Sequence, residues 1–232
     1  MKNILIVGGN SSVGKSLREK LPIENCKIYY TGTSLSENEG YFKVDLSSDT
    51  DIINCVSNLP EIDGLVLTAG IIDQVPLKFI KRETLIHFFN INFFGQLLFV
   101  SQLLKSKKIN KGASVVVVSS IAGNKFGSVG NTIYASTKAA FEGAIKCMVM
   151  ETAKQQIRIN SIQPGMLKTD MWSADKSAQI SSKELAKDEE RYPFGYGLPN
   201  DVASVIQFLL SEDSKYINGA SIVLDGGFSI QY

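Results

Sequence analysis

Two kinds of hydrophobic pattern alternate along the chain. Short apolar runs bounded by glycine or polar residues predict buried strands at 3–7, 26–31, 41–44, 64–68, 115–118, 157–163 and 221–224. Longer segments between them carry apolar residues at helical spacing, at 15–21, 49–59, 81–107, 132–155 and 199–211, with a short one at 182–187. This alternation predicts one doubly wound, Rossmann-like α/β domain over 1–232, with a parallel sheet of about seven strands.

One connection departs from the strand–helix alternation. Only about ten residues separate the second strand from the third, which is the lower limit for a parallel crossover. We therefore expect little or no helix between residues 32 and 40.

The stretch from Val115 to Lys138 carries the strongest chemical signal. A β-branched strand ends in Ser119-Ser120, and a glycine-rich loop leads into a helical pattern with Tyr134 and Lys138. Four residues apart, these two side chains share one helix face. A nearby ammonium lowers the pKa of a tyrosine from its usual ~10, which makes it a usable general acid or base. A Tyr-x-x-x-Lys spacing alone is typical of an ordinary helix surface, but its place after Ser-Ser-Ile-Ala-Gly makes it specific.

This combination resembles the short-chain dehydrogenase/reductase family, and within it 3-oxoacyl-carrier-protein reductases with a divergent nucleotide loop. The resemblance implies an active site of Asn92, Ser120, Tyr134 and Lys138. It also implies hydride transfer between a nicotinamide and a carbonyl or alcohol carbon. Tyr134 would be the acid or base, Ser120 would bind the substrate oxygen, and Asn92 would support a water beside Lys138. A capped helix kink is the alternative interpretation of Asn92.

A glycine-rich turn after the first strand predicts a phosphate cradle, because backbone amides and a helix N-terminus attract anions. The expected contacts are Gly8, Asn10, Ser11, Ser12, Val13 and Gly14. Against the family's Thr-Gly-x-x-x-Gly-x-Gly the loop is about one residue shorter, with Ser11 in place of the middle glycine. Residues 9–16 also match a P-loop formally, which we interpret as chance because it leaves Tyr134 and Lys138 unexplained.

The resemblance implies further cofactor contacts along the chain. Asp45 and Leu46 would reach the adenine, although Asp45 is also a candidate helix cap. Ala69 and Gly70 would approach a ribose, with Leu67-Thr68 replacing the family's two asparagines. The remaining contacts implied are Pro164, Gly165, Met166 and Thr169 beside the nicotinamide, and Tyr134 and Lys138 at its ribose.

The end of the second strand bears on the choice between NAD and NADP. An acid there would hold the ribose of NAD, whereas a basic residue would hold the phosphate of NADP. The chain offers Thr31, Gly32, Thr33 and Ser34, none of them acidic. This favours NADP over NAD, with Thr33, Ser34 or Lys15 as candidate phosphate contacts.

Composition narrows the function classes. The chain is 44% hydrophobic and 20% charged with a net charge of +1, which favours neither nucleic acid nor an anionic membrane as partner. Its apolar runs are shorter than the ~20 residues of a membrane span, and it begins without a signal-peptide pattern. Three scattered cysteines and the single His87 give no metal-site spacing. We expect a cytoplasmic protein with reduced thiols and no metal.

Two segments have expected roles outside the reaction itself. Residues 171–196 would form a substrate lid, with Met171, Trp172, Phe194 and Tyr196 as candidate pocket walls. The segments 81–107 and 132–155 are more apolar than one sheet face needs. Relatives use them as an interface, so we expect a homodimer or homotetramer.

Other functions stay open at this stage. A non-catalytic nucleotide-binding sensor or scaffold is favoured by the altered loop but disfavoured by the complete active-site set. An epimerase or dehydratase of the extended branch would have a longer C-terminal part than this chain. Among reductases, 3-oxoacyl-carrier-protein reductases and sugar or polyol dehydrogenases fit equally well as handlers of a small carbonyl or alcohol substrate.

Overall fold

A computed structural model describes residues 1–22, 24–169 and 182–230, the side chains of 182–185 excepted. Its sheet has the strand order β3-β2-β1-β4-β5-β6-β7, and every neighbouring pair is parallel. The predicted seven-stranded parallel α/β domain is therefore confirmed. The strands are β1 (Lys2–Val7), β2 (Cys26–Gly32), β3 (Tyr41–Lys43), β4 (Ile62–Leu67), β5 (Ile109–Val118), β6 (Arg158–Pro164) and β7 (Ser221–Leu224).

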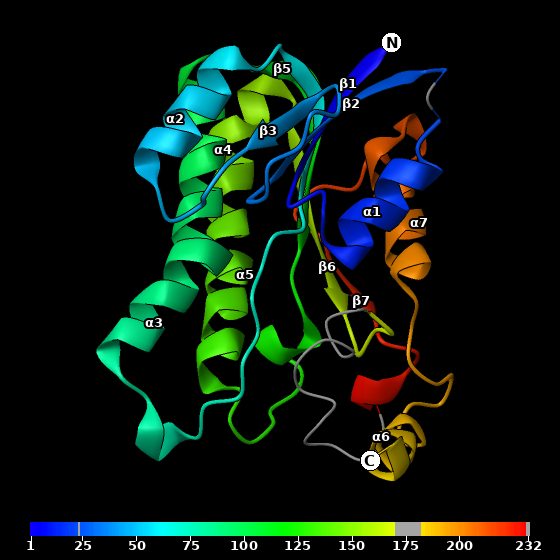
Figure 1. Cartoon of the computed structure of the whole chain (residues 1–232). Helices are drawn as coiled ribbons and strands as arrows, with labels where there is room; N and C mark the ends of the chain where they lie inside the picture. The colour runs from blue at the N-terminus through cyan, green and yellow to red at the C-terminus, as the bar shows by residue number, and fades with distance from the viewer. Residues whose placement is uncertain (23, 170–181, 231–232) are drawn as a thin grey trace.

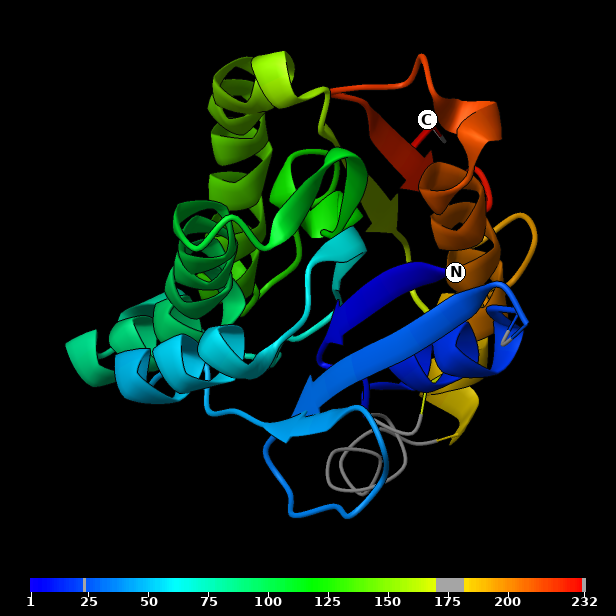
Figure 2. The same ribbon diagram turned by 90° about the horizontal axis from the view of Figure 1, so that it is seen from above.

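Helices cover both faces of the sheet (Figures 1 and 2). One face carries α2 (Asp49–Asn58), α4 (Gly95–Lys105) and α5 (Thr132–Thr152), and the other carries α1 (Ser12–Lys20) and α7 (Pro199–Leu210). Two further helices are α3 (Arg82–Phe89) and α6 (Ser182–Glu189). No helix lies between β2 and β3, as the short connection predicted.

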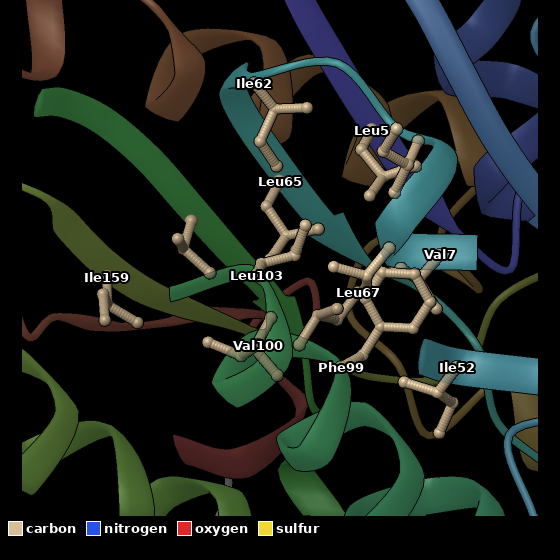
Figure 3. Close-up of a cluster of buried hydrophobic side chains, with 14 of the residues drawn as sticks. Leu5, Val7, Ile52, Ile62, Leu65, Leu67, Phe99, Val100, Leu103 and Ile159 are labelled. Carbon is tan, nitrogen blue, oxygen red and sulfur yellow. The ribbon is translucent and has the colours of Figure 1, made fainter. Parts of the chain in front are cut away.

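Alternation along the buried strands divides the core in two. In β1, Leu5 and Val7 face α4, whereas Ile4 and Ile6 face α1 and α7, because successive strand residues point to opposite faces. Figure 3 shows the first cluster, where Phe99 and Leu103 of α4 lie against β4. Burying each large apolar side chain stabilises the fold by roughly 1.5–3 kcal/mol, so these clusters fix the sheet that holds the site.

The segment expected to be one helix over 81–107 is interrupted. Residues Asn90–Phe94 form a π-helical turn between α3 and α4, in which the amide of Gly95 bonds to the carbonyl of Asn90. Gly95 also passes so close to Leu46 that a Cβ there would lie 2.0 Å from its carbonyl oxygen. Such π-turns are rare and frequent at functional sites, and this one carries Asn92.

The same helical segment is notably apolar. By length and composition, Arg82–Lys105 could cross a membrane, with a mean hydropathy of 1.3. The expectation that the apolar runs are too short for a span therefore does not hold for this helix. In the fold this segment packs against α2 and α5, which buries 33% of the apolar window (Figure 1).

Candidate active site at the carboxyl ends of the strands

Ser120, Tyr134 and Lys138 come together beyond the end of β5. Ser120 follows the strand, and its hydroxyl interacts with that of Tyr134, in the first turn of α5. The Lys138 ammonium lies 5.6 Å from the centre of the Tyr134 ring and donates to the Val118 carbonyl oxygen at 3.0 Å. Lys138 is buried, whereas Tyr134 and Ser120 are half-buried. The geometry places a proton donor, its hydrogen-bond partner and a cation around one point.

Burial dominates the titration of these groups. Burial raises the pKa of Tyr134, and the hydrogen bond from Ser120 opposes that rise. Burial also lowers the pKa of Lys138 to about 8. The expectation that Lys138 lowers the pKa of Tyr134 below its usual value is therefore not met in this structure. The physical reason is that both groups lose water together, which disfavours phenolate and ammonium alike.

Asn92 ties three segments together from the π-turn. Its side-chain oxygen accepts the Ile71 amide at 2.8 Å, and its nitrogen donates to the Ile71 carbonyl at 2.9 Å and to the Thr137 hydroxyl at 3.2 Å. The loop after β4 is thereby fixed against α5, one residue before Lys138. A Cβ on Gly70 would lie 3.4 Å from the Asn92 oxygen and 3.6 Å from the Lys138 nitrogen. Gly70 therefore lies beside Asn92 and Lys138, and its contact with a ribose stays a prediction.

The nucleotide loop is tightly built, and our alignment of it is wrong by one position. Counted from Val7, residues 7–14 supply all eight positions of the fingerprint, so the loop is not shortened and Ser12 replaces the middle glycine. Ser11 instead caps α1 by accepting the Gly14 amide at 3.0 Å. Gly8 has φ +88°, and a Cβ on Gly14 would lie 2.6 Å from the Gly8 carbonyl. The tight turn thus places the first-turn amides of α1, at Ser12 and Val13, at the loop.

Two threonines that the sequence analysis did not select hold this loop. The buried Thr31 at the end of β2 accepts the Gly8 amide at 3.1 Å. Thr68, after β4, donates to the Gly8 carbonyl at 2.9 Å and pairs with the Ser11 hydroxyl at 3.1 Å. Thr68 thus replaces one family asparagine with a different set of bonds. A hydroxyl at the end of a buried strand was the sequence signal available for both.

The adenine-side residues fall into different environments. Asp45 is exposed, and its carboxylate accepts the amide and hydroxyl of Ser47, which lowers its pKa. Ser48, rather than Asp45, caps α2. Leu46 is a buried core residue, and its carbonyl contacts Gly95. Asn10 lies against Gly32, since a Cβ added to Gly32 would lie 2.6 Å from the Asn10 side chain. The next residue, Thr33, is exposed.

The segment after β6 folds against the second half of the expected lid. Gly165 donates to the Leu224 carbonyl, and Met166 packs with Tyr192, Tyr196 and Phe228. Tyr196 thus joins an aromatic wall, whereas Phe194 is 89% exposed and is not a pocket wall in this structure. Thr169 is the last described residue of this segment, and Met171 and Trp172 lie outside the described residues. A salt bridge from Lys168 to Glu189 of α6 joins the two sides at 2.7 Å.

Known proteins match this chain over almost its whole length. A family model described as Enoyl-(Acyl carrier protein) reductase matches residues 31–229. The chain is 30% identical to Carbonyl reductase family member 4 of Xenopus laevis, over 97% of each chain. It is 27% identical to the 3-oxoacyl-[acyl-carrier-protein] reductase FabG of Rickettsia felis, over 97% of this chain and 96% of that one.

Solved structures support the fold in the same way. A short chain dehydrogenase family protein from Francisella tularensis matches with a TM-score of 0.90 and 27% identity, over all of both chains. ElxO with NADP bound matches with a TM-score of 0.87 and 26% identity, also over all of both chains. These relatives are named as enzymes, so the non-catalytic alternative gains no support. The chain belongs to the short-chain dehydrogenase/reductase family of NAD(P)-dependent oxidoreductases, which act on carbonyl and alcohol groups.

Proposed function

We propose that this protein reduces a small carbonyl compound, or oxidises the corresponding alcohol, at the point where Ser120, Tyr134 and Lys138 meet. The observation that carries this proposal is that Ser120 acts on the Tyr134 hydroxyl while the Lys138 ammonium lies 5.6 Å from the centre of the Tyr134 ring. Tyr134 donates its hydroxyl proton to the substrate oxygen, and Ser120 hydrogen-bonds that oxygen. Lys138 supplies positive charge beside the developing phenolate, and Asn92 holds the loop that borders it.

The residues present fit a nicotinamide nucleotide. Gly8 and Gly14 allow the turn that a phosphate cradle needs, and the amides of the first turn of α1 lie at that turn. Gly8 and Asn10 to Gly14, together with Ala69 and Gly70, would hold its phosphate and ribose groups. Asp45 and Leu46 would lie at the adenine, and Pro164, Gly165, Met166 and Thr169 at the nicotinamide. When bound, the nucleotide supplies the hydride chemistry, which no side chain can provide.

NADP is the preferred nucleotide in this proposal. β2 ends in Thr31-Gly32 and is followed by the exposed Thr33, so no carboxylate stands at the strand end to repel a phosphate. Glu39, the nearest acid to β3 in the connection, is paired with Lys27 at 3.4 Å. ElxO, a structural relative at 26% identity, carries NADP.

An acid introduced at Thr33 tests this preference. We expect Thr33→Glu to weaken NADPH binding tenfold or more and to leave NADH binding within about twofold, because a carboxylate repels only the extra phosphate. Thermal-shift titrations with each nucleotide measure both affinities. Leu35→Glu, at the 87% exposed Leu35 in the same connection, is the control and should change neither. Equal weakening of both nucleotides by Thr33→Glu would remove Thr33 from the phosphate site.

The reaction itself is tested by nucleotide oxidation against a panel of carbonyl compounds. The panel includes short 3-oxoacyl thioesters and diketones, because relatives are named as a 3-oxoacyl-[acyl-carrier-protein] reductase and a diacetyl reductase. It also includes aldoses, because the sequence fits a sugar dehydrogenase equally well. Turnover of any of them by the wild type supports the proposal. Nucleotide binding without turnover of any class would instead favour a sensor or scaffold.

The proposal also covers the oligomeric state and the cellular compartment of the protein. Exposed apolar side chains on the outer helices, Ile86, Phe94 and Met150, favour a homodimer or homotetramer. The cysteines of the described chain, Cys26, Cys55 and Cys147, are free thiols, which suits the reducing cytoplasm. Among the described residues no group of acids, histidines and cysteines could hold a metal, so the proposed chemistry uses the protein's own proton donor.

A further inference from the structure

A buried carboxyl group lies one helical turn from Lys138 on α5, and the reaction as described above does not use it. Glu142 is 9% exposed and follows Lys138 by one turn of α5. Its Oε2 atom accepts the hydroxyl of Ser161 on β6 at 3.1 Å and that of Ser221 on β7 at 2.5 Å. A buried acid is costly unless a charge or several hydrogen bonds compensate for the lost water, so its retention needs a reason.

Other buried polar groups accompany Glu142 on the same side of the sheet. Ser161 and Gln163 are two apart on β6 and therefore share the face that α5 covers. Ser119 neighbours Gln163, because the register pairs Val118 with Ile162 one residue earlier. Within the described residues, three buried side-chain groups have no hydrogen-bond partner: the amide of Gln163, Oγ of Ser119 and Oε1 of Glu142. A polar strip thus runs under α5 from Glu142 to the strand ends at which the site lies.

We propose that Glu142 is a positioning residue whose carboxylate acts as the buried counter-charge of the Lys138 ammonium. This inference rests on the proposed role of Lys138 and adds a second residue to it. The two side chains are four apart on one helix, which places them on the same face. Their attraction acts across space rather than through a direct hydrogen bond. Ser161 and Ser221 hold the carboxylate in place from the sheet.

Glu142 is the acid whose charge acts on the Lys138 ammonium. Burial lowers the pKa of Lys138, and the charge of Glu142 acts in the opposite direction. On α5 the other titratable group near Lys138 is Tyr134. The Lys138 ammonium donates to the Val118 carbonyl of β5, and the Asn92 amide of the π-turn bonds to Thr137, the residue before Lys138. β6 and β7 contribute hydroxyl and amide groups. The carboxylate of Asp225, after β7, is bonded to the amides of Gly227 and Ser229.

The pH dependence of carbonyl reduction tests the role of the charge. Glu142→Gln keeps the shape and removes the charge, so the alkaline limb of kcat should move down by about one pH unit. That shift corresponds to about tenfold slower turnover at a pH well above the limb. Glu151→Gln, at an exposed position of the same helix, should leave the profile unchanged. A Glu142→Gln profile that is lower at every pH but keeps the wild-type limb would overturn the proposal.

A conservative variant separates charge from packing. Glu142→Asp keeps the carboxylate, so it should retain the wild-type alkaline limb even if its turnover is lower. Equal shifts of the limb in Glu142→Asp and Glu142→Gln would mean that the side-chain fit, rather than the charge, matters, and would overturn the proposal.

A stability cycle tests the coupling without any catalytic assay. We expect Glu142→Gln to change the melting temperature at pH 7 by a different amount in the wild type than in the Lys138→Met background. At pH 10, where Lys138 is neutral, the two changes should become equal. If Glu142→Gln changes the melting temperature equally in both backgrounds at pH 7, the proposed pairing of Glu142 with Lys138 is overturned. Because the cycle uses no substrate, it stands even if the proposed reaction proves wrong.

Discussion

At the scale of single residues, the chemistry of the site depends on how burial and hydrogen bonding compete at Tyr134. Its hydroxyl is partnered by Ser120, while loss of water makes the phenolate costly. A tyrosine in this state keeps its proton at neutral pH and can give it to a substrate oxygen. In the proposed reaction, Ser120 and the nearby Lys138 ammonium stabilise the phenolate that this transfer leaves.

Removal of the Tyr134 hydroxyl is the direct test of that role. We expect Tyr134→Phe to reduce turnover a hundredfold or more, the scale of a lost general acid. NADPH affinity should stay within a fewfold of the wild type, because the ring remains in place. Steady-state kinetics and a nucleotide titration measure the two effects. Near-normal turnover in this variant would exclude Tyr134 as the proton donor.

Lys138 should make the stability of the fold depend on pH. Its folded-state pKa of about 8 lies below the ordinary 10.5, so the folded protein binds fewer protons between these values. The charged form therefore destabilises the fold below about pH 8, and the penalty disappears as the pH rises toward 10.5. We expect Lys138→Met to be more stable than the wild type at pH 7, with an advantage that shrinks across this window.

Urea unfolding of both proteins at pH 7, 8.5 and 10 measures this advantage. Lys146→Met, at an exposed position of the same helix, should show a difference from the wild type that is independent of pH. An advantage of Lys138→Met that stays constant or grows with pH would contradict the lowered pKa.

The residue scale also shows what the sequence could predict. Ser120, Tyr134 and Lys138 were predictable because a strand end, a loop and a helix face are local features that a pattern encodes. The roles of Thr31, Thr68 and Glu142 were not, because each depends on which segments lie opposite across the sheet. The predicted shift in the pKa of Tyr134 was wrong in direction, because the burial that raises this pKa is a property of the whole fold.

At the scale of elements, most strands and helices lie where the hydrophobic pattern predicted them, because the buried strands are strongly apolar and the helices carry apolar residues at helical spacing. The segment 81–107 was predicted as one helix from its apolar spacing, and only the interpretation of Asn92 as a helix kink pointed to the π-turn at Asn90–Phe94. β5 was expected only at 115–118 but begins at Ile109, where polar residues at its exposed start weaken the apolar signal. The close approach of Gly95 to the Leu46 carbonyl lies at the end of the π-turn, and such a contact between distant segments cannot be read from the sequence.

The π-turn contact gives a prediction with a matched control. Gly95→Ala would place a Cβ 2.0 Å from the Leu46 carbonyl oxygen, so we expect destabilisation of about 2 kcal/mol or more. Gly143→Ala, at an exposed position of α5 with no atom within 4 Å of its Cβ, should stabilise the fold by about 0.5–1 kcal/mol. Chemical denaturation measures both. A neutral Gly95→Ala would mean that α4 can move away from Leu46.

At the scale of the whole molecule, the outer layer of helices leaves apolar surface uncovered. Leu85, Ile86 and Phe94, from α3 and the π-turn, are 36%, 48% and 51% exposed, and Met150 of α5 is 76% exposed. If the protein assembles through this layer, Phe94→Asp should shift its mass toward that of a monomer without loss of secondary structure. Sedimentation and circular dichroism measure the two. Leu35→Asp, in the connection between β2 and β3, is the control and should not change the mass.

The clamp at Asn92 also has a consequence for how the protein acquires its activity. The site joins the loop after β4, the π-turn, the end of β5 and the first turns of α5, which meet only when neighbouring parallel strands have paired. Parallel pairing is slow because long connections must close before any contact forms. A refolding chain therefore recovers its helices early and its catalytic competence late. Regained turnover then reports the completion of the sheet rather than the formation of any one element.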